Sequence, residues 1–241
     1  MSSNFYWQNK IAAYLQESVV KVFDIRNRDE WAKQINESVG VTIEKADKLK
    51  IQQAAYIASG LTRAALPYDD SQLEKIILKH PLVKNTSIEL DIQNVSISKL
   101  VKEIKDLLET DLAELTRDLS EEEKAKQIFY YLFFAFNKQL RKSDKEELSK
   151  VGAFWDILPA DTRMPDHPMW HHFGMTSAIY SCLEKNSSSS DKNNLSLVVY
   201  SITPVQDFIG KARKLRDYWT GSVLLSYLAF SGITVVMEEL G

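Results

Sequence analysis

The sequence has little cysteine, no excess of positive charge and no apolar N-terminal segment. Its single cysteine, Cys182, cannot form an internal disulfide or a thiolate metal cluster, which fits a reducing compartment. The 30 basic residues stand against 33 acidic ones, and the net charge of −3 excludes a broadly polycationic nucleic-acid binder. Because no basic stretch followed by an apolar run opens the sequence, no secretory signal is predicted. We therefore expect a cytoplasmic protein.

Apolar residues in helical spacing are abundant. Hydrophobic residues make up 44% of the 241 positions, which is enough for a packed core. Through residues 1–185 the one exception to helical spacing is Ile88–Ile92, whose alternation predicts a short strand or a loop. The first predicted helix starts at Trp7 and has a face of Ile11, Leu15 and Val19. The next two cover residues 28–39, ending at Gly40, and residues 46–65, ending before Pro67. Further helices are predicted over 71–78, around 100–108, over 121–140 and from near Pro168.

Capping signals and an aromatic run mark two of these helices. Ser71 with Glu74, and Ser120 with Glu123, have the spacing of a capping box. The run 129–136 is rich in phenylalanine and tyrosine, and its helical context favours a core helix over a ligand site. The interior residues expected to be deeply buried in this helix are Ile128, Tyr131, Leu132, Ala135 and Phe136.

The composition changes at Asn186, where a polar run without apolar residues predicts a flexible linker. After it, residues 195–202 predict a buried strand, Thr203–Gln206 a helix start, and Trp219 the approximate beginning of a last helix. A lone strand leaves both edges unpaired, so this last unit is interpreted as the opening of a larger domain. The predicted organisation is a helical domain over 1–186, a linker over 187–194 and a strand–helix–helix unit over 195–241.

Three of the four histidines fall in one short segment. Asp166, His167 and His172 would suit a divalent metal; alternatively, Asp166 caps the helix that begins near Pro168 and the histidines make local hydrogen bonds. The neighbouring Asp161–Arg163 favours an ion pair that holds the loop, with contact to a phosphate or an RNA backbone as the alternative.

The last unit has three features with open interpretations. Backbone amides at the turn over Ser201–Gln206 favour a phosphate, although the turn lacks the glycines of a P-loop. Tyr218–Met237 has twenty positions without a charge, which permits a membrane anchor, but its small and hydroxyl side chains favour a buried helix. A basic side, interpreted either as a solvated helix face or as a surface for nucleic acid or acidic protein, comprises Lys211, Arg213, Lys214 and Arg216.

Two motifs together resemble the large subunit of type III CRISPR effector complexes of the Cmr (III-B) kind. The first motif is matched by Pro159–Arg163, Pro165–His167, Trp170, His172 and Thr176–Ala178. The second, with Thr203 in place of the family glycine, is matched by Ser201–Ile202, Pro204–Gln206, Phe208–Ile209, Ala212–Arg213, Arg216–Asp217, Trp219, Gly221–Ser222, Leu224–Ser226 and Leu228. Looser matches along the chain are Tyr6–Trp7, Leu15, Asp24–Ile25 and Ile57–Gly60.

The resemblance implies an HD-type nuclease domain followed by an α/β, ferredoxin-like palm that makes cyclic oligoadenylate from ATP when target RNA is bound. The nuclease motif is altered in this chain. Gln16 and Glu17 stand at the paired His-Asp, and Ala55 and Thr62 stand at two aspartates. Since glutamine and threonine cannot replace an imidazole and a carboxylate as metal ligands, a degenerate, nuclease-dead HD-like domain is expected.

The palm is expected to be incomplete. The resemblance places its metal carboxylates in a Gly-Gly-Asp-Asp turn, whereas no two of the eight glycines in this sequence are adjacent. ATP and Mg²⁺ are therefore expected only in a complete subunit, and this chain alone is expected to be inactive. The residues expected beside the nucleotide are Ser201, Pro204, Val205 and Gln206.

The fold expectation is thus a mainly α protein, with an HD-like helical bundle and the opening β-α-α of a palm. The implied function is a structural part of a type III-B RNA-guided antiviral effector complex, whose other subunits, guide RNA and target RNA are the partners, without a membrane. Two alternatives stay open. One is a residual metal-dependent phosphohydrolase that uses Asp166, His167 and His172, and the other is a helical adaptor anchored in a membrane through Tyr218–Met237.

Overall fold

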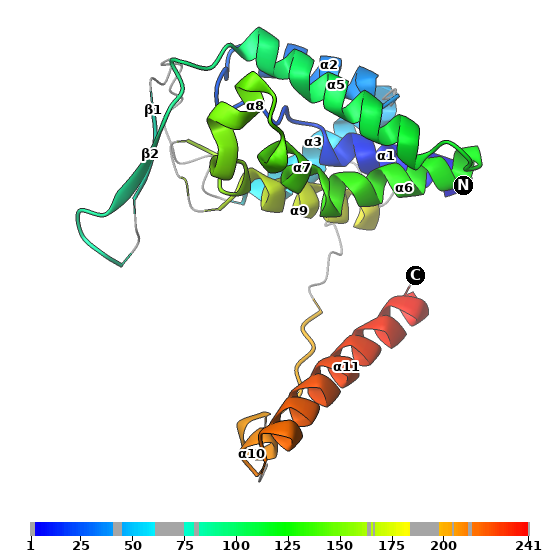
Figure 1. The fold of residues 1–241 in the computed structure, drawn as a ribbon. Coiled ribbons are helices and arrows are strands. Elements are labelled where there is room, and N and C mark those ends of the chain that lie inside the picture. Colours follow the sequence, from blue (N-terminus) through cyan, green and yellow to red (C-terminus); the bar gives the residue numbers. More distant parts are fainter. Residues whose placement is uncertain are drawn as a thin grey trace. The chain divides into compact units, whose positions relative to one another are not determined.

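The protein is mainly helical with a small two-stranded antiparallel sheet (Figure 1), which confirms the mainly α class. This architecture comes from a computed structural model, which divides the chain into two units, Met1–Asn193 and Asn194–Gly241. The structure describes residues 3–40, 45–60, 75–79, 82–162, 165, 167–183, 198–203, 205–211 and 214–240. The predicted linker over 187–194 lies outside these residues.

The first unit is built mostly from helices. Its described elements are α1 (Ser3–Tyr14), α2 (Arg28–Ser38), α3 (Lys45–Ser59), β1 (Lys75–Lys79), β2 (Ser87–Asp91), α5 (Ile97–Leu115), α6 (Glu121–Phe134), α7 (Phe136–Lys142), α8 (Glu146–Val151), the 3₁₀ helix η1 (Gly152–Asp156) and α9 (Met169–Cys182). The described helices of the second unit are α10 (Val205–Gly210) and α11 (Leu215–Leu240).

Helix α1 packs against α3, α6 and α9 and supplies the centre of the first core. Its Ile11 and Tyr14 are almost fully buried. The helix ends at Tyr14, so the prediction of one helical face that continues to Leu15 and Val19 is wrong beyond that point. Both side chains are buried nonetheless, because the chain turns into the core and Asn36 Nδ2 donates to the Leu15 carbonyl over 3.1 Å.

Glycines end the next two helices. Helix α2 ends just before Val39 and Gly40, where φ is +73°, as the sequence predicts. Helix α3 ends at Ser59 because Gly60 has a φ of +62°, a conformation that glycine adopts without strain. The predicted end near residue 65 is therefore too late. Residues 61–74, with the predicted capping box of Ser71 and Glu74, lie outside the described residues.

Within the described part of the short helix predicted over 71–78, residues 75–78 belong to a hairpin instead. Strand β1 pairs in antiparallel register with β2, and Ile76 lies opposite Leu90. Both side chains are buried while Ile77 is exposed, which is the alternation of a strand rather than the spacing of a helix. The strand predicted at Ile88–Ile92 is confirmed as β2, with its bounds shifted by one residue.

The predicted helix over 121–140 is divided in two. Its capping box is confirmed, since the Ser120 hydroxyl accepts from Glu123 N over 3.4 Å and Ser120 N donates to Glu123 Oε2 over 3.2 Å. Ala135, with φ −121° and ψ −35°, then separates α6 from α7. This break lets the aromatic residues before and after it face different neighbours.

Only part of the aromatic run is core. Phe129, Tyr131, Leu132 and Phe136 are buried as the helical spacing predicts, whereas Ile128 and Ala135 are half-buried. The core interpretation is wrong for the other rings of α6, because the helix buries one face and leaves the opposite face in solvent. Those exposed rings are Tyr130, Phe133 and Phe134.

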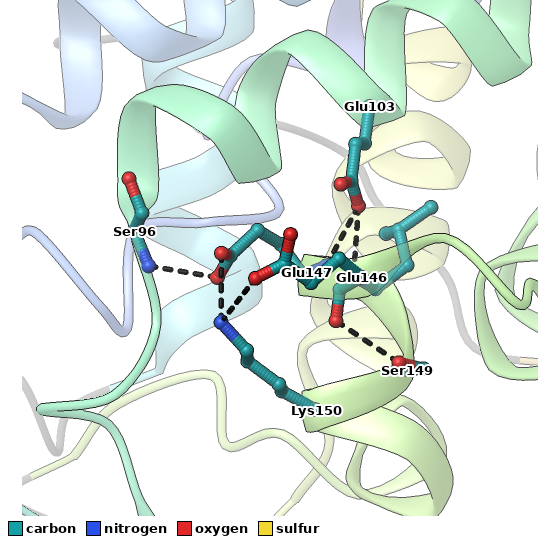
Figure 2. Close-up of polar contacts among 7 residues, drawn as sticks. Ser96, Glu103, Glu146, Glu147, Ser149 and Lys150 are labelled. Carbon is teal, nitrogen blue, oxygen red and sulfur yellow. Dashed lines mark hydrogen bonds and ion pairs between the residues drawn. The ribbon is translucent and has the colours of Figure 1, made fainter.

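Helices α5 and α8 satisfy each other's N-terminal amides (Figure 2). Glu103 of α5 accepts hydrogen bonds from Glu147 N and Leu148 N, both at 3.0 Å. In return, Glu147 Oε2 accepts from the backbone N–H of Ser96, which precedes α5, over 2.8 Å, while Lys150 donates to Glu147 Oε1 over 2.8 Å. Carboxylates at helix N-termini accept hydrogen bonds from free backbone amides and are attracted to the positive end of the helix dipole. This reciprocal arrangement orients the segment that leads into α9.

The second unit differs from its prediction in two ways. Residues 198–203 form no strand, because no neighbouring strand among the described residues offers them backbone partners. Helix α10 begins at Val205 as predicted but ends at Gly210, so Phe208 and Leu215 do not share one helix face. Helix α11 then begins at Leu215, four residues before the predicted start.

Candidate functional site

A polar cluster lies where α1 gives way to a buried turn and meets α9. Lys21 Nζ donates to Glu17 Oε2, and the same carboxylate oxygen lies 3.6 Å from His172 Nε2. The Lys21, Glu17 and His172 side chains are 8%, 13% and 1% exposed, so the cluster is largely removed from water. We call these three side chains the Glu17 cluster.

The turn that carries the cluster is fixed by its apolar neighbours. Val19, Val20, Val22 and Phe23 are all buried around Lys21, and they hold its backbone against the core. The buried Ser18 hydroxyl accepts from Val20 N over 3.2 Å, which closes the turn locally. His172 is placed by α9, which packs on both α1 and α3.

The Glu17 cluster does not fit a metal centre. A divalent ion at Glu17 would have to replace the ammonium of Lys21, because two cations beside one carboxylate repel each other in a poorly hydrated site. Across the described part of the chain, no group of three or more histidine, cysteine, aspartate or glutamate side chains is arranged to hold a metal. Ala55 and Thr62 stand at the two positions where the resembled family has aspartates. Ala55 lies on α3 with its methyl group buried, and Thr62 lies outside the described residues.

The predicted metal candidates are brought only partly together. The rings of His167 and His172 have centroids 6.3 Å apart. His167 is held by the backbone, since its carbonyl accepts from Ala160 N over 3.0 Å next to a β-bridge between Pro159 and Pro168. Asp166, the third candidate ligand, and Arg163 of the predicted loop ion pair lie outside the described residues. The helix predicted from near Pro168 is confirmed as α9.

Lys21 is the member of the Glu17 cluster that inspection of motifs missed. The sequence contains a signal for it, because a single lysine interrupts the otherwise apolar run Val19–Phe23. A lysine in such a run must reach solvent or find a buried counter-charge. Glu17 lies four residues earlier and supplies that charge, although the two residues are not part of a helix.

Asp24, part of a looser family match, has a structural role beside this turn. Its carboxylate accepts from Asn27 Nδ2 over 2.8 Å and from Trp31 Nε1 over 3.0 Å. Burial is the largest single influence and favours the neutral acid, but the hydrogen bonds from Asn27 and Trp31 together outweigh it and lower the pKa of Asp24. The contacts tie the turn to α2.

The predicted nucleotide residues lie at the start of α10. Ser201, Val205 and Gln206 are all exposed, and Pro204 lies outside the described residues. Of the predicted basic side, Lys211, Lys214 and Arg216 are exposed and Arg213 is not described. This segment therefore offers donors and cations to solvent, without a metal-ligand group among its described residues.

Known proteins align with both units. A family model described as the N-terminal part of the CRISPR-associated protein Cmr2 matches residues 197–241. The CRISPR system Cmr subunit Cmr2 of Pyrococcus furiosus is 27% identical over an alignment 274 positions long, gaps included, that covers 97% of this chain. The chain is similar to Cmr2 subunits. The Cmr2 subunit of Saccharolobus solfataricus is 28% identical over an alignment 213 positions long that covers 83% of this chain.

These matches confirm the resemblance to the N-terminal portion of a Cmr-type large subunit. The chain spans 30% of the length of the Pyrococcus relative and 17% of the Saccharolobus relative. The family model falls on the exposed turn and the helices α10 and α11, whereas the Pyrococcus alignment also includes the unit that carries the Glu17 cluster.

Proposed function

We propose that this chain acts as the N-terminal part of the large subunit of an RNA-guided type III-B CRISPR antiviral effector complex in the cytoplasm. The similarity to Cmr2 over 97% of the chain carries the proposal. Its partners are the other subunits of the complex, and guide and target RNA are reached through them. Co-purification from the native cell tests this assignment.

Within that assembly, the first unit is a degenerate HD-like domain without nuclease activity. The Glu17 cluster supports this, because Lys21 supplies the positive charge that a metal would otherwise bring to the carboxylate. Hydrolysis of a phosphodiester by a metal-activated water requires several ligands around the ion. The ammonium of Lys21 binds the carboxylate without generating a nucleophile, so the domain keeps its fold and lacks the reaction.

A metal-binding and nuclease assay tests this part of the proposal. Titration of the chain with Mn²⁺ or Ni²⁺ in a calorimeter is expected to show no stoichiometric site, and single-stranded DNA is expected to remain uncut. The competing function is a metal-dependent phosphohydrolase that uses Asp166, His167 and His172. Stoichiometric binding that disappears in His167→Ala would support that competitor and contradict the inactive domain.

The second unit is the opening of a palm that binds ATP and Mg²⁺ when complete and then makes cyclic oligoadenylate. The exposed start of α10, matched by the Cmr2 family model, supports a position of Ser201, Pro204, Val205 and Gln206 beside the nucleotide. In a large subunit with a complete palm, Gln206→Ala is expected to lower cyclic-oligoadenylate synthesis at unchanged complex assembly. Unchanged synthesis would contradict that position.

One observation favours a second candidate function for α11. Residues Leu215–Val236 form a helix long and apolar enough to cross a membrane by length and composition, and none of that window is buried. A membrane-anchored adaptor would need detergent for extraction from native cells. We favour the palm because the family model matches residues 197–241, which include this helix, and extraction without detergent is the expected result.

A further inference from the structure

A groove in the first unit lies between α1, α6 and α9, and none of the three residues of the Glu17 cluster lines it. It encloses about 480 Å³ and is lined mainly by apolar and aromatic groups, among them Phe133, Trp170 and Met175. Phe133 is 44% exposed and Met175 is 52% exposed, although both lie beside well-buried core residues. Large exposed apolar groups gathered around a concavity mark binding surfaces rather than ordinary protein exterior. We call this feature the aromatic groove.

The groove is preformed by close packing at its base. A Cβ atom added to Gly174 of α9 would lie 3.2 Å from Cε2 of Phe133, so glycine lets the α6 ring approach the α9 backbone. Phe133 also contacts Phe129 and Phe134, with ring centroids 5.8 Å and 4.8 Å away. These contacts restrict the ring before any ligand arrives, which lowers the entropy cost of binding.

One cation is fixed at the edge of the groove. Lys10 Nζ donates to Ser181 Oγ over 3.0 Å and to Tyr6 Oη over 3.4 Å, and it lies 5.2 Å from the centre of the Phe129 ring. An ammonium has three donors, so one hydrogen remains for an incoming acceptor. The surrounding helices add no negative charge: α1 and α9 contain no aspartate or glutamate, and α6 contains none after Glu123.

The chemistry of the groove distinguishes between classes of partner. A nucleic acid depends on several phosphate contacts, but Lys10 is the one lysine or arginine among the described residues that line the groove. A bilayer presents a flat surface, which does not enter a concavity. Aromatic residues and methionine are enriched at protein interfaces, and helical segments bind apolar grooves through spaced anchors. A protein segment with apolar anchors and acidic residues fits both the lining and the charge.

We propose that the aromatic groove binds an amphipathic, acidic segment of a partner protein, whose apolar side chains enter between α6 and α9 and whose carboxylate pairs with Lys10. The proposal does not depend on the assignment to a type III-B complex, because it is argued from the lining and the charge of the groove alone. The partner is defined by its chemistry, as apolar anchors next to aspartate or glutamate.

Photo-crosslinking in the native cell tests the proposal on the full chain. Phe133→p-benzoylphenylalanine places the reactive ketone in the groove, and Tyr56→p-benzoylphenylalanine, at an exposed site on α3, is the matched control. The expected result is an adduct from position 133, absent from position 56, on one protein segment that mass spectrometry shows to be apolar and acidic. An adduct on nucleic acid, lipid or a basic segment, adducts shared with position 56, or no adduct would overturn the proposal.

A charge-swap pair at Met175 tests the acidic character separately. Both Met175→Glu and Met175→Lys remove the same exposed side chain, so both are expected to fold, but they place opposite charges in the groove. Because like charges at an interface repel, Met175→Glu should lower the adduct yield about tenfold while Met175→Lys changes it less than about twofold. Equal loss in both variants, or greater loss in Met175→Lys, would contradict an acidic partner.

Discussion

Lys21 and Glu17 show how one side chain can decide what a buried site does. An ammonium removed from water is stable only with a close counter-charge, and Glu17 provides it at the end of α1. His172 lies beside the same carboxylate, so removal of Lys21 would leave a buried anion next to an imidazole. We therefore expect the identity of residue 21 to affect the stability of the first unit.

Substitution Lys21→Met is expected to destabilise the chain by about 3–5 kcal/mol, because it removes the ammonium that is paired with the largely buried Glu17 carboxylate. Urea unfolding followed by circular dichroism measures the change. The double variant Glu17→Gln with Lys21→Met removes both charges and should recover much of the loss. If the double variant loses as much unfolding free energy as the two single variants lose together, the ion pair makes no net contribution to stability.

Glu147 predicts a pH dependence of stability. Burial is the largest influence on this carboxyl and raises its pKa, but hydrogen bonds from Lys150 and from Ser96 N together lower the pKa below its ordinary value of 4.5. A lowered pKa in the folded state stabilises the protein above pH 4.5, and this contribution disappears as the pH falls through the folded pKa.

The expected outcome is a smaller loss of unfolding free energy between pH 6 and pH 3 for Glu147→Gln than for the wild-type chain. Urea titrations at both pH values measure it. Glu146→Gln is the matched control, because Glu146 also contacts Lys150, at 3.4 Å, but its side chain is 68% exposed. An identical pH response in wild type and Glu147→Gln would contradict the role given to this carboxylate.

At the scale of elements, the sequence predicted periodicity better than it predicted ends and faces. The capping box of α6 and the glycine after α2 are local signals, so the sequence determined both. The hairpin was recognised only in part, because Lys75–Lys79 forms a strand through pairing with the later residues Ser87–Asp91. Which rings of α6 are buried depends on the positions of α1 and α9, which the spacing within α6 does not specify.

Neighbouring positions on α6 should respond very differently to truncation. Leu132 is 1% exposed, so Leu132→Ala is expected to cost about 2–5 kcal/mol of unfolding free energy through the lost contacts and the cavity left behind. Phe133 is 44% exposed, so Phe133→Ala is expected to cost about 1 kcal/mol or less. Thermal and urea unfolding of the two variants measure both values. Equal losses would show that α6 is rotated relative to this description.

At the scale of the whole molecule, the chain combines two units with different surfaces. The first unit has a buried apolar core around α1, whereas α11 exposes Trp219, Tyr227 and Phe230. The sequence allowed both interpretations of this apolar segment, a membrane anchor or a buried helix, because composition does not specify what covers a helix. The Cmr2 similarity favours coverage by protein, and the turn at Ser201–Gln206 remains a prediction for the nucleotide.

Limited proteolysis tests the predicted organisation into two domains. The polar residues 187–194 cannot help to bury a core, so a low dose of a non-specific protease should cut there first. The expected product is a stable fragment that ends near residue 186, detected by intact mass. First cleavage inside α5 or α6 would contradict an independently packed helical domain.

The most direct test of the central proposal is co-purification of the tagged chain from its native cell, with mass spectrometry of bound proteins and sequencing of bound RNA. The account predicts other Cmr subunits together with guide-sized RNA. Recovery of the chain alone and free of RNA, under conditions that retain assembled complexes, would contradict a role in a type III-B effector complex.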